Sequence, residues 1–328
     1  MEESKTVSKP YYWHEKKINF NRRATWHDYS SVCIYMITLR KANGIPPFAI
    51  LSGSPTAAYT RSTPVGDQIS FALSELHKKF PECHVDRHVL MPDHIHFILS
   101  VNERLQGFTI SKLVNSLMGN STARLRKEGL IAAEASAFAK GFNDRILSKQ
   151  GQLQIWKNYI SDNPRRLMII KERSSYFKRI SAVTINGRRC TVYGNFLLLR
   201  KPEKALGVIS SRYSAEERRH YNALWSESLR CGGVLVSPFI SEKEKALYAR
   251  AVAAGLSIIR IVKGGLPERF KPWKSEFDLC GSGRLLLIAD DSYDPQEKGI
   301  QRNECLELND FARYIVSAEE PQLTLLAR

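Results

Sequence analysis

The chain has 328 residues, which is enough for two domains that each bury a hydrophobic core. Its hydrophobic fraction of 43% and its charged fraction of 25% are ordinary for a folded protein and argue against a largely disordered chain. The net charge of +16 favours nucleic acid over an anionic membrane as the partner, because no apolar run approaches the ~20 residues of a membrane-spanning helix. The first residues lack the apolar core of a signal peptide, so we expect a cytoplasmic protein with no membrane partner.

The first half of the chain predicts strands and amphipathic helices. Residues 30–40 are rich in strand-forming side chains, and the Gly-, Pro- and Ser-rich residues after them predict a loop around a short strand at 48–51. The other elements expected here are, in chain order, a helix over 63–79, strands over 84–90 and 94–101, a helix over 109–126, a short strand over 142–147 and a helix over 153–163 that Pro164 ends.

The second half has a different pattern. Residues 181–199 predict a β-hairpin, because two strand-forming runs flank an Asn-Gly turn. Beyond it the elements alternate, with strands expected over 205–211, 233–237, 257–262 and 284–289 and helices over 215–229 and 241–254. Alternation with apolar strands implies a parallel sheet covered on both faces. We place the domain boundary near Arg200, with residues 1–200 forming the first domain, basic hairpin included, and residues 201–328 the second.

Two histidines on one predicted strand form the most informative local pattern. His94 and His96 flank Ile95, and because strand side chains alternate between faces, both imidazoles point the same way while Ile95 points into the core. Such a pair is half of a metal site, although an isolated pair of this kind also occurs in packing or on a surface. A zinc barrel of the amidohydrolase type would need further histidines, and only His220 follows. The adjacent strand carries a second alternating set, interpreted as structural or DNA-facing: His84, Asp86 and His88.

A tyrosine and an amide are spaced for one helical face downstream. Tyr159 and Asn163 lie at i and i+4, so a helix places one above the other. Tyrosine is among the side chains that form covalent intermediates, and amide oxygens suit magnesium or manganese. This helix could therefore present a nucleophile and a ligand to the same metal.

Basic side chains on the predicted helices are candidate DNA contacts. Arg and Lys on an exposed helix face suit phosphate groups, and a merely solvated face is the alternative. The candidates are Lys112, Arg124 and Arg126 on one helix and Arg165 and Arg166 after the other.

Four segments carry a family resemblance by their order and spacing. They resemble the REP-associated tyrosine transposases, single-tyrosine members of the HUH transposases, over roughly residues 30–170: VLMPDHIHFIL, SKLVNSLMGNSTARLRK, GFNDRIL and YISDNPRR. The resemblance implies an α+β fold, with a ferredoxin-like antiparallel sheet and helices packed on it.

The same resemblance implies a chemistry and a substrate. By position, Tyr159 would be the nucleophile, and a divalent metal, Mg or Mn, would be held by His94, His96 and Asn163. The implied function is a transposase-like endonuclease and strand transferase that cuts single-stranded DNA beside hairpins through a 5′-phosphotyrosine intermediate. A homodimer is a candidate assembly.

Two other functions compete with this interpretation. The first is a domesticated protein that binds hairpin DNA without mobilising it, against which the four intact candidate residues argue. The second is a replication initiator or relaxase, which often has a second nucleophilic tyrosine close to the first. Here the nearest tyrosine downstream of Tyr159 is Tyr176.

The second half resembles the Rossmann-like core of DNA-processing protein A over about residues 204–292. That family has a Gly-rich turn onto a helix, where backbone amides approach phosphate. Here the turn reads Ser237-Pro238-Phe239, and Pro238 has no amide hydrogen, which argues against a phosphate site. We therefore expect a Rossmann-like accessory domain with a structural or DNA-holding role.

Overall fold

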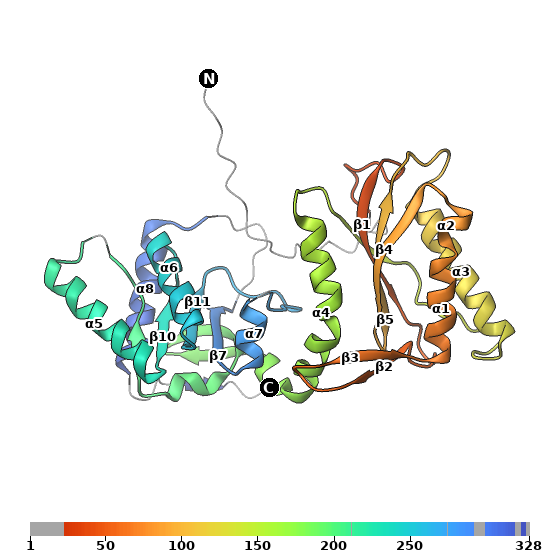
Figure 1. Cartoon of the computed structure of the whole chain (residues 1–328). Helices are drawn as coiled ribbons and strands as arrows, with labels where there is room; N and C mark the ends of the chain where they lie inside the picture. The colour runs from red at the N-terminus through yellow and green to blue at the C-terminus, as the bar shows by residue number, and fades with distance from the viewer. Residues whose placement is uncertain (1–22, 211, 274, 292–298, 319–322, 326–328) are drawn as a thin grey trace, which may run out of the picture. The chain divides into compact units, whose positions relative to one another are not determined.

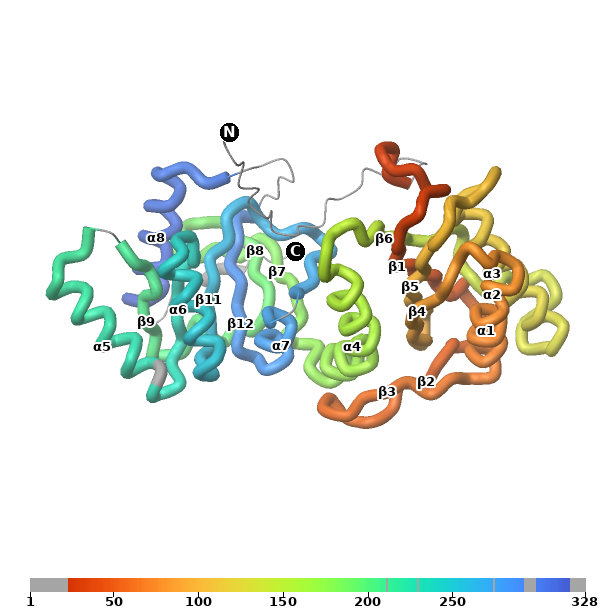
Figure 2. The backbone as a smooth tube through the Cα atoms, turned by 45° about the horizontal axis from the view of Figure 1, so that its top comes forward, coloured from red at the N-terminus to blue at the C-terminus, as the bar shows by residue number. Residues whose placement is uncertain are grey.

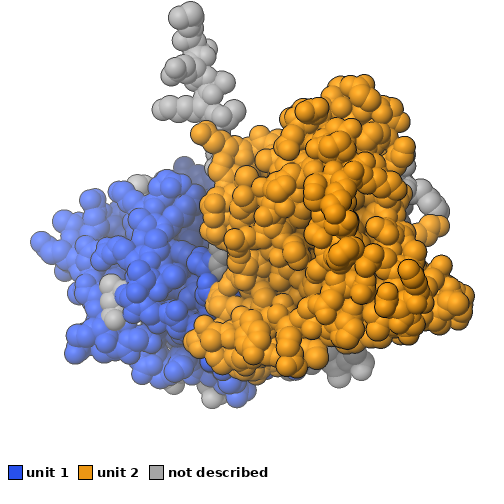
Figure 3. All heavy atoms as spheres, turned by 45° about the vertical axis from the view of Figure 1, so that its right-hand side comes forward, with its two compact units in different colours: residues 1–17, 173–328 blue, residues 18–172 orange. Residues whose placement is uncertain are grey.

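A computed structural model describes residues 23–210, 212–273, 275–291, 299–318 and 323–325. The chain divides into two compact units, which are described separately below. The N-terminal unit comprises residues 18–172 and the C-terminal unit residues 173–328, together with the first 17 residues (Figure 3). Among the described residues, no helix is both long enough and apolar enough to cross a membrane.

The N-terminal unit is built on a four-stranded antiparallel sheet with the spatial order β4-β5-β1-β6. Its elements are β1 (Cys33–Arg40), β2 (Ala49–Ser52), β3 (Tyr59–Ser62), α1 (Pro64–Ser74), α2 (Leu76–Lys79), β4 (Cys83–Leu90), β5 (His94–Val101), α3 (Ile110–Lys127), β6 (Asn143–Ile146) and α4 (Gln152–Glu172). Leaving aside the β2–β3 hairpin and α2, the order up to β6 is β-α-β-β-α-β, the split arrangement of ferredoxin-like folds, and α4 follows it. The expected antiparallel sheet with helices packed on it is confirmed.

The two faces of this sheet have different partners. Alternate residues of β5, namely Ile95, Phe97 and Leu99, join the hydrophobic core formed with α1 and α3. His94, His96 and the residues that continue this alternation belong to the opposite face, which α4 covers (Figures 1 and 2). Strand alternation therefore separates a closed core from a face that carries polar side chains.

The second alternating set on β4 does not stay on one face. A β-bulge shifts the register between Val85 and Arg87, so that His84 pairs with Ser100 but His88 pairs with Phe97 of the core face. The extra residue of a bulge re-aims the side chains around it. The alternation expected for His84, Asp86 and His88 is therefore interrupted, because His88 lies on the other face of the strand from His84.

Helix α4 does not end at Pro164 as expected, because the proline lies inside a 21-residue helix. Its buried face includes Trp156 and Ile160 before the proline and Ile169 after it. A proline inside a helix removes one hydrogen bond and crowds the preceding turn, but burial of an apolar face on both sides offsets this cost.

The C-terminal unit is built on a seven-stranded mixed sheet with the order β13-β7-β8-β12-β11-β10-β9. Its elements are the 3₁₀ helix η1 (Ser174–Phe177), β7 (Arg179–Ile185), β8 (Arg188–Gly194), the 3₁₀ helix η2 (Phe196–Arg200), β9 (Lys204–Leu206), α5 (Ala215–Cys231), β10 (Val234–Ser237), α6 (Glu242–Ala253), β11 (Ser257–Val262), α7 (Ser275–Gly281), β12 (Leu285–Asp290), α8 (Arg302–Ser317) and β13 (Leu323–Leu325). Strands β9 to β12 are parallel, as expected from the alternating pattern.

The basic hairpin belongs to this second sheet. Its turn residues Asn186 and Gly187 both have positive φ, as the Asn-Gly pattern predicts. Strand β8 then pairs with β12 in an antiparallel ladder from Cys190 to Gly194. The compact units therefore divide at Arg173 rather than near Arg200, because hydrogen bonds tie the hairpin to strands that follow it in the chain.

Helices cover both faces of the second sheet. Helix α8 packs on one hydrophobic core and helices α6 and α7 on the other. The four parallel strands lie in the sheet in the order in which they occur in the chain. The described parallel strands thus lack the reversal of strand order that makes the ligand crevice of doubly wound folds.

Candidate active site

The two candidate metal ligands lie together at the start of β5. The ring centroids of His94 and His96 are 4.5 Å apart. His94 Nδ1 lies 2.7 Å from Asp93 Oδ1, and His96 Nδ1 lies 2.7 Å from Thr38 Oγ1. In the tautomer that donates from Nδ1, these acceptors orient both rings and leave Nε2 as the nitrogen for a metal, which is the usual arrangement around metal-binding histidines.

The neighbour of His94 is an ionised carboxylate. The hydrogen bond from His94 holds the pKa of the Asp93 carboxyl at about 2. The Asp93 side chain therefore remains an acceptor over the whole physiological pH range and favours the tautomer of His94 that carries hydrogen on Nδ1.

Helix α4 brings the candidate nucleophile to this face. The ring centroids of Tyr159 and His96 are 6.0 Å apart, and the tyrosine ring also contacts Trp156, which is buried on the sheet side of the helix. Polar contacts from the β4 bulge hold the helix: Arg87 donates to Ser161, and Asp86 Oδ1 lies 3.6 Å from the Lys157 ammonium.

Opposing electrostatic influences act on the Tyr159 hydroxyl. Burial raises its pKa above the ordinary value, Arg166 and Arg145 lower it, and Asp162 raises it. The Arg166 guanidinium lies over the ring, 5.6 Å from its centroid. The hydroxyl is therefore protonated at neutral pH, and the two guanidinium groups favour both its phenolate and a nearby phosphodiester.

Asn163 is the third candidate ligand and lies on α4, one helical turn after Tyr159. It is buried, and its Nδ2 donates to the Tyr159 carbonyl oxygen at 2.9 Å, which leaves Oδ1 as the end that can bind a cation. The described residues contain no group of three or more His, Cys, Asp and Glu side chains that could hold a metal ion. Two imidazoles and one amide oxygen are nevertheless a donor set that fits a divalent metal.

The expected DNA contacts fall in two places. Lys112, Arg124 and Arg126 lie on α3, across the sheet from the histidine pair, so the structure does not bring them to the site. Arg124 donates to Gln68 and Arg126 to the Ala135 carbonyl oxygen.

The remaining two basic candidates lie on α4 beside the nucleophile. Arg165 forms an ion pair with Asp162, with nitrogen–oxygen distances of 2.5 and 3.1 Å. Arg166 is the member of the expected set that lies over the Tyr159 ring. Among the five basic candidates, Arg166 is therefore the one placed to contact a phosphate at the tyrosine.

Sequence reasoning missed Thr38, Asp93 and Arg145. Asp93 directly precedes His94, and a carboxylate next to a candidate ligand is a signal that could have identified it. Thr38 becomes a neighbour of His96 through the pairing of β1 with β5, and Arg145 reaches the site through the pairing of β6 with β1. A single sequence does not reveal these strand pairings.

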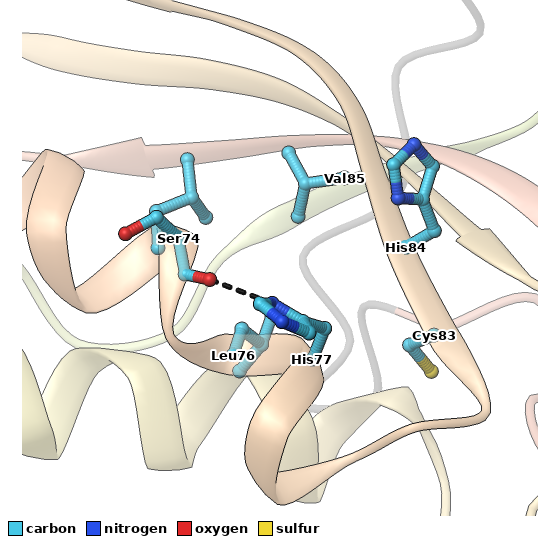
Figure 4. A pocket seen from close by; sticks show the side chains of 7 residues that line it. Ser74, Leu76, His77, Cys83, His84 and Val85 are labelled. Atoms are coloured by element: carbon cyan, nitrogen blue, oxygen red, sulfur yellow. Dashed lines mark hydrogen bonds between the residues drawn. The ribbon is translucent and has the colours of Figure 1, made fainter.

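A separate pocket lies between α1, α2 and the start of β4 (Figure 4). Its volume is about 380 Å³, and it is lined by Leu73, Ser74, Leu76, His77, Cys83, His84 and Val85. His77 is engaged with the Ser74 carbonyl oxygen, and burial raises the pKa of the Cys83 thiol to about 12. Cys83 pairs with Val101, at the end of β5 away from the histidine pair, so this pocket is not part of the candidate site.

A side chain fills the position in the C-terminal unit where a Gly-rich turn would bind phosphate. The buried Glu244 carboxylate accepts hydrogen bonds from the backbone amides of Ile209, Ile240 and Ser241 at 2.9, 2.7 and 3.1 Å. These amides surround the N-terminus of α6, where a phosphate would otherwise bind. An internal carboxylate thus satisfies this helix end, in agreement with the argument from Pro238.

Comparison with known proteins identifies the region that holds the site. Residues 60–163 match the family model described as "Transposase IS200 like". No curated protein matches the chain.

Solved structures that resemble the chain at low similarity include the following two. A REP-associated tyrosine transposase bound to a REP hairpin is 14% identical, with 43% of this chain and 73% of that chain covered and a TM-score of 0.31. A crystal structure described as that of a "putative transposase" from Deinococcus radiodurans R1 is 15% identical, with 43% of this chain and 97% of that chain covered and a TM-score of 0.26. Because both TM-scores are low, the identification depends on the family match and not on these two structures. The candidate nucleophile and all three candidate ligands fall inside that match, and residues 60–163 are therefore assigned to the IS200-like transposases, a class of DNA-processing enzymes.

Proposed function

We propose that the N-terminal unit cuts and rejoins single-stranded DNA through a covalent bond to Tyr159. The observation that carries this proposal is the contact of the Tyr159 ring with His96, which brings a nucleophile beside two imidazoles oriented through Nδ1. The family match supports the transposase class, and the geometry supports the residue roles proposed below.

The proposed reaction is an exchange of one phosphodiester for another. The Tyr159 oxygen attacks the phosphorus and loses its proton, and the bond from phosphorus to the 3′-oxygen breaks. The 3′-oxygen takes up a proton and leaves as a hydroxyl, while the 5′-phosphate remains on the tyrosine. Attack by a 3′-hydroxyl on this phosphotyrosine reverses the exchange and joins strands.

Each side chain has a role that follows from its position. Arg166 and Arg145 attract the phosphodiester and favour the tyrosine phenolate. His94, His96 and Asn163 would hold a divalent cation, magnesium or manganese, which when bound polarises the scissile phosphate. Asp93 and Thr38 keep the two imidazoles in the ligating tautomer.

The proposed substrate is single-stranded DNA beside a hairpin. The net charge of +16 favours a polyanion, and the REP-associated transposase among the similar structures is described as bound to a REP hairpin. We propose the C-terminal unit, with its four parallel strands, as an accessory domain that holds DNA, and a homodimer as the active assembly.

Replacement of the nucleophile tests the proposal. Wild-type protein with manganese and a 3′-labelled hairpin oligonucleotide should yield a labelled protein band that resists denaturation by SDS. The 5′-labelled oligonucleotide should instead release a free fragment that ends in a 3′-hydroxyl. Tyr159→Phe should abolish the band, EDTA should prevent it, and Tyr221→Phe in the C-terminal unit should leave it unchanged. A band of full yield from Tyr159→Phe would refute the assignment.

A further inference from the structure

The segment after β1, expected to be a loop around one short strand at 48–51, is a two-stranded ribbon with an unusual outer face. Strands β2 and β3 pair antiparallel, with Ile50 opposite Arg61 and Ser52 opposite Tyr59. Residues directly opposite each other lie on the same face of such a pair. One face therefore presents an aliphatic side chain, an aromatic ring and a guanidinium, and Ile50 and Tyr59 are 47% and 56% exposed.

The ribbon begins at the turn that leads into the candidate site. The Phe48 amide, directly before β2, donates to the Pro92 carbonyl oxygen at 3.2 Å. The Thr63 amide, directly after β3, donates to the Phe48 carbonyl oxygen at 3.2 Å. Pro92 is two residues before His94, so both ends of the ribbon are anchored beside the histidine pair.

The ribbon also reaches the helix that carries the nucleophile. Strand β3 contacts α4, and in Figures 1 and 2 the ribbon runs from the sheet towards that helix. The ribbon thus lies next to both elements of the candidate site, the strand with the histidines and the helix with Tyr159.

The charge of this segment matches an anionic partner. Residues 41–66 contain two charged side chains, Lys41 and Arg61, and both are basic. The Lys41 ammonium donates to the carbonyl oxygens of Ala42 and Ile45 beside the ribbon, whereas Arg61 is exposed on the ribbon itself. A single exposed apolar residue needs no explanation, but an aromatic ring and a guanidinium on one face beside a phosphate-processing site match the features of single-strand binding surfaces.

We propose that the outer face of the β2–β3 ribbon binds single-stranded DNA next to the scissile phosphate, with Tyr59 stacked on a base and Arg61 on a backbone phosphate. The inference builds on the proposed function, because it names how the same site holds its substrate. Exposed aromatic rings stack on any base, so the ribbon would position the strand without reading its sequence.

Binding and stacking can be measured without cleavage. Full-length Tyr159→Phe protein is titrated into single-stranded oligonucleotides that carry 2-aminopurine at successive positions around the cleavage site. One position should show quenched fluorescence. Adding Tyr59→Ala should remove this quench and weaken binding about tenfold, the effect expected for the loss of one stacked base. Adding Tyr59→Trp should preserve both.

A matched control separates stacking from general loss of apolar surface. Trp26 is also exposed, but it precedes the start of β1. The start of β1 pairs with the end of β5 that is away from His94. Trp26→Ala should therefore change neither the fluorescence quench nor the affinity for DNA. Equal affinities for Tyr59→Ala and Trp26→Ala, with the quench retained, would overturn the ribbon proposal. If the wild-type protein still forms the tyrosine adduct in that case, only the ribbon proposal fails and the proposed function is retained. Absence of the adduct from the wild-type protein refutes the proposed function, whatever the ribbon binds.

Discussion

The two histidines of the candidate site are oriented by different neighbours. An ionised carboxylate, Asp93, orients His94, whereas a hydroxyl on an adjacent strand, Thr38, orients His96. Both neighbours act through Nδ1, so they affect the nitrogen that would bind a metal without touching the metal themselves. Such contacts commonly alter metal affinity by 10- to 100-fold.

Replacing Thr38 should weaken metal binding while leaving the fold intact. Valine has nearly the same shape as threonine but cannot accept a hydrogen bond from His96. Thr38→Val should raise the manganese concentration for half-maximal cleavage by about 10- to 100-fold, with cleavage recovered at saturating metal. Thr38→Ser, which keeps the hydroxyl, should behave nearly as wild type. An unchanged manganese dependence in Thr38→Val would show that this hydroxyl does not position His96.

At the scale of elements, an internal side chain satisfies the backbone amides at the start of one helix, α6. Glu244 accepts from amides of two separate loops. The carboxylate therefore joins the loop after β9 to the start of α6. Its role is structural, and the helix end is closed to an external phosphate.

Removing this carboxylate should destabilise the C-terminal unit. Glu244→Ala would leave three amides without their acceptor and should lower the free energy of unfolding of that unit by about 2–3 kcal/mol. Glu244→Gln keeps an acceptor oxygen and should cost less. Glu242→Ala, at an exposed position of the same helical turn, is the control. Denaturant unfolding followed separately for the two units gives the measurement, and equal stability of Glu244→Ala and Glu242→Ala would contradict the prediction.

At the scale of the whole molecule, the division after Glu172 determines which fragments can fold. The β7–β8 hairpin lies in the sheet of the C-terminal unit, and its residues Val183, Ile185 and Val192 are buried in that core. A chain ending near Arg200 would carry this hairpin without β12, the strand that pairs with it. Unpaired strand edges and exposed apolar side chains promote association.

Truncation should therefore distinguish the two boundaries. A chain ending at Glu172 should show a cooperative thermal transition, stay monodisperse in size-exclusion chromatography and still form the Tyr159 adduct. A chain ending at Arg200 should aggregate or unfold at a lower temperature. Folding of the shorter chain without adduct formation would mean that the C-terminal unit helps to build the active site. A lower transition temperature for the chain ending at Glu172 than for the chain ending at Arg200 would contradict the boundary after Glu172.

The sequence by itself determined the local features of this protein. The alternation around His94 and His96 predicted a strand with both rings on one face, and the Asn186-Gly187 pair predicted a hairpin turn. The order and spacing of four segments over roughly residues 30–170 also predicted the transposase class, which the family match confirms. These features were predictable because side-chain alternation, helical spacing and turn chemistry act between residues that are close in the chain.

The tertiary structure decided what depends on contacts between distant segments. It placed Thr38 beside His96, put α3 and its basic residues across the sheet from the site, and carried α4 through Pro164. It also joined the hairpin to β12 and paired the expected short strand at 48–51 with a second strand, β3, to form a ribbon beside the site. Strand pairing and burial determine these outcomes, and one sequence read locally does not show which strands pair or which helix face is buried.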